Sequence, residues 1–176
     1  MRKGILIGAL GVLIYSCGGG GGGSSDLGSI GSSFPAGGSS SAYVRVLDVS
    51  VDRQEVNLGD TFNVSFSLDY NTSVAMVSLY LSDAQELPKN KGNYKIGYKN
   101  CYPNSLNGFA DCGTQGTLQC EYSNLSGNRY VKCGISGNAV FLQNTGNKYL
   151  ILEACIWNEN FQEVCTKKAI SIRFNP

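Results

Sequence analysis

The clearest pattern in the sequence is a strict alternation of apolar and polar residues between positions 61 and 70. The apolar residues all share one parity: Phe62, Val64, Phe66, Leu68 and Tyr70. A period of two is typical of a strand that packs one face against a core and turns the other to water. The segment is therefore predicted to be a half-buried strand of an antiparallel sheet.

Shorter segments with strand-like patterns recur along the chain at 43–50, 74–82, 138–143, 148–157 and 164–174. In the first, the inward-facing parity changes between Val46 and Val49, which predicts a β-bulge near Leu47-Asp48. No window of twelve residues has a convincing helical period. Short strands divided by turn signals predict an all-β protein with an antiparallel β-sandwich.

The N-terminus has a different pattern, in which Met1-Arg2-Lys3 precedes an apolar run that ends at Ile14. The run has the length of a signal-peptide core and is too short for a permanent transmembrane helix. It leads into Leu13-Ile14-Tyr15-Ser16-Cys17, which resembles the bacterial lipobox. The resemblance implies removal of residues 1–16, acylation of Cys17 and, because Gly18 is not aspartate, retention in the outer membrane. An ordinary secretory signal beside a chance cysteine is the alternative.

Residues 17–42 follow as a predicted disordered tether, which contains six consecutive glycines from Gly18 to Gly23. The remaining residues, 43–176, suit one domain with its own core. Without Arg2 and Lys3, 12 of the 14 basic residues remain against 13 acidic ones. A charge so close to zero gives no reason to expect nucleic acid as a partner.

Three segments of the domain resemble CARDB-type immunoglobulin-like domains of bacteria. They are the opening stretch Val49 to Val64, the strand Val77 to Asp83, and the closing hairpin Leu150 to Val164. The resemblance implies an immunoglobulin-like sandwich with a binding, adhesive or spacer role and carries over no catalytic residue. Residues 84–137 depart from the family pattern and are predicted to be a cysteine-rich insertion.

The residue types exclude several kinds of chemistry. The chain has no histidine, which excludes Ser-His-Asp and Cys-His nucleophile systems and histidine-containing metal sites. No two cysteines have the Cys-x-x-Cys spacing of many zinc sites. We therefore expect no cofactor and no metal, and we expect the six cysteines of the domain to form disulfides, as is usual in an exported protein.

A pairing of these cysteines follows from hairpin register. A two-residue turn at Ser126-Gly127 sets Cys120 opposite Cys133, and a five-residue loop at 158–162 sets Cys155 opposite Cys165. Cys101 and Cys112 remain and would close a loop. A redox-active pair is the alternative, but an activating motif is missing.

The candidates for recognition lie between residues 89 and 102, where tyrosines and lysines are interspersed. The residues proposed to contact a ligand are Tyr94, Tyr98, Tyr102, Lys95 and Lys99. Tyrosine rings and lysine ammonium groups can stack on sugars or contact anionic glycans. The alternative is an edge strand that its lysines protect from aggregation. Trp157 is expected to pack in the core or at a hairpin tip.

These features predict a non-enzymatic envelope lipoprotein that displays an immunoglobulin-like binding or adhesion module. Its expected partners are the membrane, through the lipid anchor, and a protein or glycan. A docking subunit of a larger envelope complex is the alternative. A hydrolase is disfavoured because the usual pairings of nucleophile and base are missing.

Overall fold

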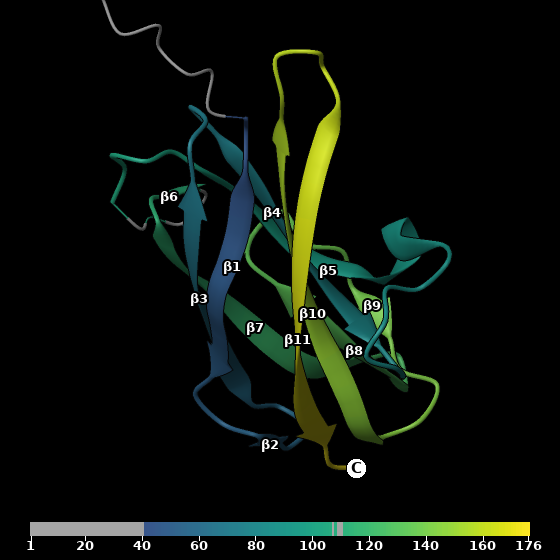
Figure 1. The fold of residues 1–176 in the computed structure, drawn as a ribbon. Coiled ribbons are helices and arrows are strands. Elements are labelled where there is room, and N and C mark those ends of the chain that lie inside the picture. Colours follow the sequence, from purple (N-terminus) through teal and green to yellow (C-terminus); the bar gives the residue numbers. More distant parts are fainter. Residues whose placement is uncertain (1–40, 107, 109–110) are drawn as a thin grey trace, which may run out of the picture. The chain divides into compact units, whose positions relative to one another are not determined.

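The computed structural model describes residues 41–106, 108 and 111–176 (Figure 1). The lipobox, Cys17 and the glycine tether lie outside the described residues. Within them the chain forms eleven strands and one 3₁₀ helix, η1 (Lys91–Tyr94). None of the described segments is a helix long and apolar enough to cross a membrane. The prediction of an all-β protein is confirmed.

The strands form two sheets. Sheet A has the order β1 (Val44–Val51), β3 (Thr61–Tyr70), β7 (Gln115–Leu125), β8 (Asn128–Cys133) and β9 (Val140–Phe141). Sheet B has the order β2 (Glu55–Val56), β11 (Glu163–Phe174), β10 (Gly146–Trp157), β4 (Ala75–Ser82), β5 (Lys95–Cys101) and β6 (Asp111–Cys112). Neighbouring strands are antiparallel except for the short pairs β2–β11 and β5–β6.

This strand order is immunoglobulin-like. In the immunoglobulin fold, strands A, B and E share one sheet and strands C, F and G share the other. Here β1, β3 and β7 occupy the first three places, and β4, β10 and β11 occupy the second three. Strand β8 lies beside β7, where strand D would lie, although it follows β7 along the chain. The predicted immunoglobulin-like sandwich is therefore confirmed.

The core lies between the two sheets and follows the alternation seen in the sequence. All five apolar residues of β3 are at most 8% exposed. The ring of Phe174 meets those of Phe62 and Tyr122 edge to face, at centroid distances of 6.0 and 5.0 Å. The register of β1 against β3 shifts between Val46 and Asp48, which confirms the predicted bulge.

Residues 84–137 have a larger part in the fold than the predicted insertion. They supply β5, β7 and β8, and β7 lies between β3 and β8 in sheet A. The inward positions of β7 include Gly116 and Cys120. The core-facing side of this strand is therefore not marked in the sequence by a regular alternation of large apolar residues. Gly116 is required by packing, because an added Cβ would lie 2.3 Å from Cζ of Phe66.

The three disulfides are Cys101–Cys112, Cys120–Cys133 and Cys155–Cys165, as predicted. Cys120 faces Cys133 across the β7–β8 hairpin, and Cys155 faces Cys165 across β10–β11. The third disulfide joins β5 to β6. The register argument from the two turns is therefore confirmed.

Candidate functional site: the outer face of sheet B

The outer face of sheet B is the side that points away from the core. On β10 it carries Ile151, Glu153, Cys155 and Trp157, because these alternate with the core residues Leu150, Leu152, Ala154 and Ile156. Across the sheet, Glu153 lies between Lys167 of β11 and Ser78 of β4, and Ser78 faces Tyr98 of β5. Four strands thus contribute side chains to one continuous surface.

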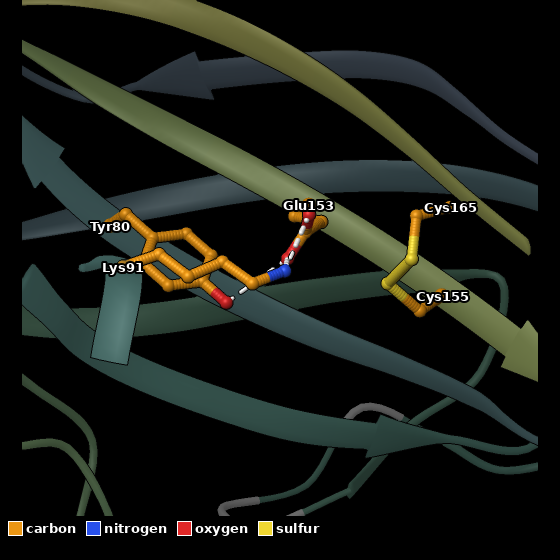
Figure 2. The surroundings of a disulfide bond; sticks show 5 residues. All are labelled: Tyr80, Lys91, Glu153, Cys155 and Cys165. Atoms are coloured by element: carbon orange, nitrogen blue, oxygen red, sulfur yellow. Dashed lines mark hydrogen bonds and ion pairs between the residues drawn. A yellow bond between two sulfur atoms is a disulfide. The ribbon is translucent and has the colours of Figure 1, made fainter. Parts of the chain in front are cut away.

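A carboxylate on this face is held by two donors (Figure 2). The ammonium group of Lys91 lies 3.0 and 2.8 Å from the two carboxylate oxygens of Glu153. The hydroxyl of Tyr80 donates to Oε2 of Glu153 at 3.0 Å. Only 7% of Glu153 is exposed, although it lies on the outer face. Lys91 begins η1, so the ion pair fixes this short helix against the sheet.

The electrostatics of the cluster favour the observed charges. The hydrogen bond from Lys91 to Glu153 raises the pKa of the Lys91 ammonium above its ordinary value of 10.5. Burial, followed by the nearby carboxylate, raises the pKa of the Tyr80 hydroxyl. The Nζ atoms of Lys91 and Lys95 lie 5.9 and 5.8 Å from the centre of the Tyr80 ring. The charge of Glu153 is thus balanced by that of Lys91, and the cluster holds η1 and Lys95 in place on the sheet.

The Cys155–Cys165 disulfide lies next to Glu153 on the same face (Figure 2). The two sulfurs and one carboxylate oxygen lie within 4.8 Å of one another, a spacing compatible with metal ligands. Zinc binds cysteine as the thiolate. Because each sulfur is bonded to the other, neither is available as a thiolate. The group is therefore a disulfide beside an ion pair rather than a metal centre.

The structure separates the recognition candidates into two sets. Tyr94, Tyr98 and Tyr102 are 42, 46 and 41% exposed. Tyr98 belongs to the outer face, and Tyr102 follows β5 with the same parity. Tyr94 ends η1. Lys95 is half-buried and lies across the sheet from Tyr80.

Lys99 has a different environment and is only 3% exposed. It faces the inward-pointing Val77, and its ammonium group donates to the carbonyl of Gly108 at 2.5 Å. Burial lowers the pKa of this ammonium. Lys95 and Lys99 were both proposed to contact a ligand, but the register shifts at Ile96 and puts the two lysines on opposite sides of the sheet. Lys99 is therefore not part of the exposed set.

Trp157 lies in one of the two places that were predicted for it. It is 51% exposed and lies at the end of β10, opposite Glu163. Trp157 lies beside the hairpin loop, as one of the two expectations had it. It does not pack in the core, which was the other. Residues of both parities from Ile151 to Ile156 are buried, so the face on which Trp157 lies could not be predicted from alternation.

Two hollows lie away from Tyr98, Tyr102 and Trp157. One, of about 680 Å³, is lined by residues of β3, β7 and β8 together with Lys99 and Gly108. The other, of about 310 Å³, is lined by Tyr94, Phe141 and Lys148, among others. The ammonium group of Lys148 contacts Asp83 and Asn144 there. Neither hollow is lined by Tyr98, Tyr102 or Trp157.

Comparisons with known proteins leave the function open. No protein-family model matches the sequence, and no characterised protein matches it. Among solved structures, one similar chain is the alkylpurine DNA glycosylase AlkC of Pseudomonas fluorescens, with 10% identity and a TM-score of 0.39 over 76% of this chain. Another is a β-glucosidase of Listeria innocua, with 11% identity and a TM-score of 0.32, also over 76%. The chain covers only 30% and 16% of those two proteins, and likeness this weak carries no functional argument.

Proposed function

We propose that the protein is a membrane-anchored envelope lipoprotein that displays a non-enzymatic binding module. The observation that carries the proposal is the set of exposed aromatic residues on one side of the domain, over sheet B. Exposed aromatic side chains offer large contact area at a small cost in conformational entropy. Their support is rigid, because the opposite side of the sheet is the core and a disulfide joins β10 to β11.

The anchor is proposed from the lipobox-like sequence before Cys17. Two or more acyl chains hold a protein durably on a membrane, whereas one chain holds it only marginally. The glycine-rich stretch would act as a flexible spacer between lipid and domain. Three disulfides in the domain agree with an oxidising compartment such as the periplasm or the cell surface.

A docking subunit of a larger envelope complex is the second candidate. It is favoured by the tip of the β10–β11 hairpin, where Phe161 is 86% exposed and Trp157 is 51% exposed. Two exposed aromatic residues at one loop are typical anchors of protein interfaces. In this case a protein partner would contact the hairpin tip rather than the centre of the face.

The test combines location with binding. Membranes from cells that express the wild-type chain or Cys17→Ala are separated from soluble fractions, and the intact mass of the native protein is measured. Acylation and membrane retention of the wild type, with loss of both in Cys17→Ala, are expected. An unmodified Cys17 in the native protein contradicts the anchor.

Binding is then tested by crosslinking wild-type cells and cells that carry Tyr98→Ala or Phe161→Ala. Loss of a specific crosslinked or retained partner in Tyr98→Ala supports the binding face. Selective loss in Phe161→Ala supports the docking subunit. Identical capture by the wild type and both variants contradicts both candidates.

A further inference from the structure

We propose that the smaller of the two hollows binds one pyranose ring of an uncharged sugar. This hollow has a volume of about 310 Å³ and lies where β9 of sheet A comes close to η1, with Tyr94 and Phe141 in its lining. It is not lined by Tyr98, Tyr102 or Trp157 of the outer face of sheet B. The site is therefore additional to the proposed binding face and does not depend on it.

The walls of the hollow come from segments that are far apart in the sequence. The end of β4 and the start of β10 lie side by side, because Ser82 pairs with Tyr149. The helix η1 and residues 139–144, which include β9, complete the lining. The backbone N–H of Leu142 donates to the carbonyl of Arg129 at 2.8 Å and so fixes the segment after β9 to β8. Walls that are fixed in this way keep the hollow formed before a ligand arrives, which reduces the entropic cost of binding.

Two aromatic rings of the lining are accessible to a ligand. Tyr94 and Phe141 are 42% and 52% exposed. The ring of Phe141 meets that of Tyr130 edge to face, at a centroid distance of 6.2 Å, and the ion pair of Lys91 fixes η1, which ends at Tyr94. Rings that are accessible and supported from behind are suited to stacking on an apolar face of a ligand. The C–H groups of a pyranose ring form such a face.

The polar groups of the lining suit a ligand that is rich in hydroxyls. Three side-chain amides line the hollow, those of Asn93, Gln143 and Asn144. An amide group both donates and accepts hydrogen bonds, as a hydroxyl does, so each can pair with the other in either direction. The ammonium group of Lys148 contacts the amide oxygen of Asn144, which leaves the amide nitrogen to donate elsewhere. A sugar combines an apolar face with hydroxyls at its rim and so matches both the rings and the amides.

The charges of the lining favour an uncharged ligand. Among the described residues that line the hollow, only Asp83 and Lys148 are charged, and they form an ion pair with each other. The Lys148 side chain is buried, whereas that of Asp83 is 80% exposed. A sugar with a carboxylate would bring its charge beside one opposite and one like charge, and it would lose hydration without a net attraction. A neutral pyranose does not incur this cost.

The size of the hollow and its position favour a single sugar ring over a peptide. Sites for small molecules have volumes of about 300–1,000 Å³, and this hollow lies at the lower end of that range. Extended peptides are often bound by pairing with an exposed strand edge. The strand at this edge of sheet A is β9, whose two residues, Val140–Phe141, offer few backbone groups for such pairing. A compact ring uses the side chains of the hollow instead.

The experiment titrates the full-length protein, purified in a detergent without a sugar headgroup, with the methyl glycosides of glucose, galactose, mannose and N-acetylglucosamine. The backbone amide resonances in NMR spectra report which residues respond. We expect at least one neutral glycoside to shift resonances of residues 93–94 and 139–148 in a saturable manner. The three hexosides are each compared with the methyl glycoside of the corresponding uronic acid, which has the same ring and one carboxylate. The uronide should bind about tenfold more weakly than its neutral counterpart, which corresponds to about 1.4 kcal/mol.

The variants test whether the hollow is responsible. Tyr94→Ala and Phe141→Ala should each weaken binding about tenfold, in line with the loss of one stacking contact, whereas Tyr94→Phe keeps the ring and should bind like the wild type. Asp83→Asn removes the carboxylate that contacts Lys148, so it should reduce or reverse the preference for the neutral glycoside over the uronide. Leu47→Ala is the matched control, because Leu47 is 56% exposed and lies on β1, at the opposite edge of sheet A from β9. It should leave binding unchanged. Thermal unfolding of each variant shows whether it is folded.

Several results would overturn the sugar site. They are the absence of saturable binding by all four neutral glycosides, equal weakening in Leu47→Ala, and uronides that bind the wild type as tightly as the neutral sugars. If an uncharged peptide, acetyl-Ala-Ala-Ala-amide, shifts the resonances of the hollow and no glycoside does, the hollow takes a peptide and the sugar is overturned. The capture experiment above uses Tyr98 and Phe161, which do not line the hollow. Its failure therefore leaves the sugar site in place, and failure of the titration leaves the proposed binding face in place.

Discussion

Two hairpins of this domain contain a disulfide between directly opposed residues, and the two disulfides point in opposite directions. In the β7–β8 hairpin, Cys120 and Cys133 are 1% and 0% exposed and belong to the core. In the β10–β11 hairpin, Cys155 is 6% exposed and Cys165 is exposed, both on the outer face of sheet B. The same bond thus fills the interior in one hairpin and supports the candidate binding face in the other.

The entropy of the unfolded chain does not distinguish these two hairpins. The paired cysteines are 13 and 10 residues apart, so closing the loops is worth about 3.0 and about 2.8 kcal/mol in the chain-entropy description. A difference near 0.2 kcal/mol is too small to matter. Any larger difference in stability must come from packing, because only the inner pair fills space between the sheets.

The largest effect is therefore expected for the inner disulfide. Cys120→Ala/Cys133→Ala should lower the free energy of unfolding by about 3–5 kcal/mol, since it removes the crosslink and also leaves unfilled volume beside Leu118 and Tyr122. Urea unfolding at neutral pH measures the change. A loss no greater than that of the outer pair would contradict the assigned role of packing.

The outer disulfide is expected to contribute less to stability. Cys155→Ala/Cys165→Ala should lower the free energy of unfolding by about 2–3 kcal/mol, because the core side of β10 remains filled. The comparison of the two double variants under the same urea conditions is the measurement. Binding by the outer-face variant should also decrease if the disulfide orders the face, whereas the inner-face variant, where folded, should bind normally.

The register of both hairpins could be predicted from the sequence, but the direction of the outer pair could not. Register follows from local turn chemistry at Ser126-Gly127 and at 158–162, which the chain shows directly. Predicting the direction requires one side of the strand to be consistently polar. In β10, Glu153 is the only charged residue among residues 151–156, and all six are buried. On its outer side, Lys91 of η1 contacts Glu153, a contact between segments 62 residues apart.

The same reasoning explains the outcome for the recognition residues. The exposure of the three tyrosines agrees with their place in a polar, turn-rich stretch. Lys99 was grouped with them because lysines and tyrosines are interspersed in this stretch. The extra residue at Ile96 puts Lys95 on the outer side of the sheet and Lys99 on the inner side, and a bulge in β5 has no local signal as clear as the turn glycines. Alternation is therefore informative only within an uninterrupted strand.

A smaller effect on stability is expected for the ion pair beneath the outer face. Lys91→Met should lower the free energy of unfolding by about 1–2 kcal/mol, because Glu153 stays buried with the hydroxyl of Tyr80 as a remaining donor. Adding Glu153→Leu should recover part of the loss, since an apolar pair leaves no unsatisfied charge. A double-mutant cycle in urea gives the coupling energy. Strictly additive losses would show that the two residues do not support each other.

The smallest effect is expected from alkaline pH, acting through the same pair. The pKa of Lys91 is raised in the folded state above its ordinary value of 10.5, so the folded protein holds this proton more tightly than the unfolded chain does. The stabilisation is fully present below pH 10.5 and is lost as the pH rises through the folded pKa. The raised pKa of Tyr80 acts in the same direction, beginning near its ordinary value of 10.0. Urea midpoints of the wild type and Lys91→Met should therefore differ by a constant amount from pH 7 to 9 and converge above pH 10.5. A difference that stays constant to the highest accessible pH would mean that the charge of Lys91 does not stabilise η1 on the sheet.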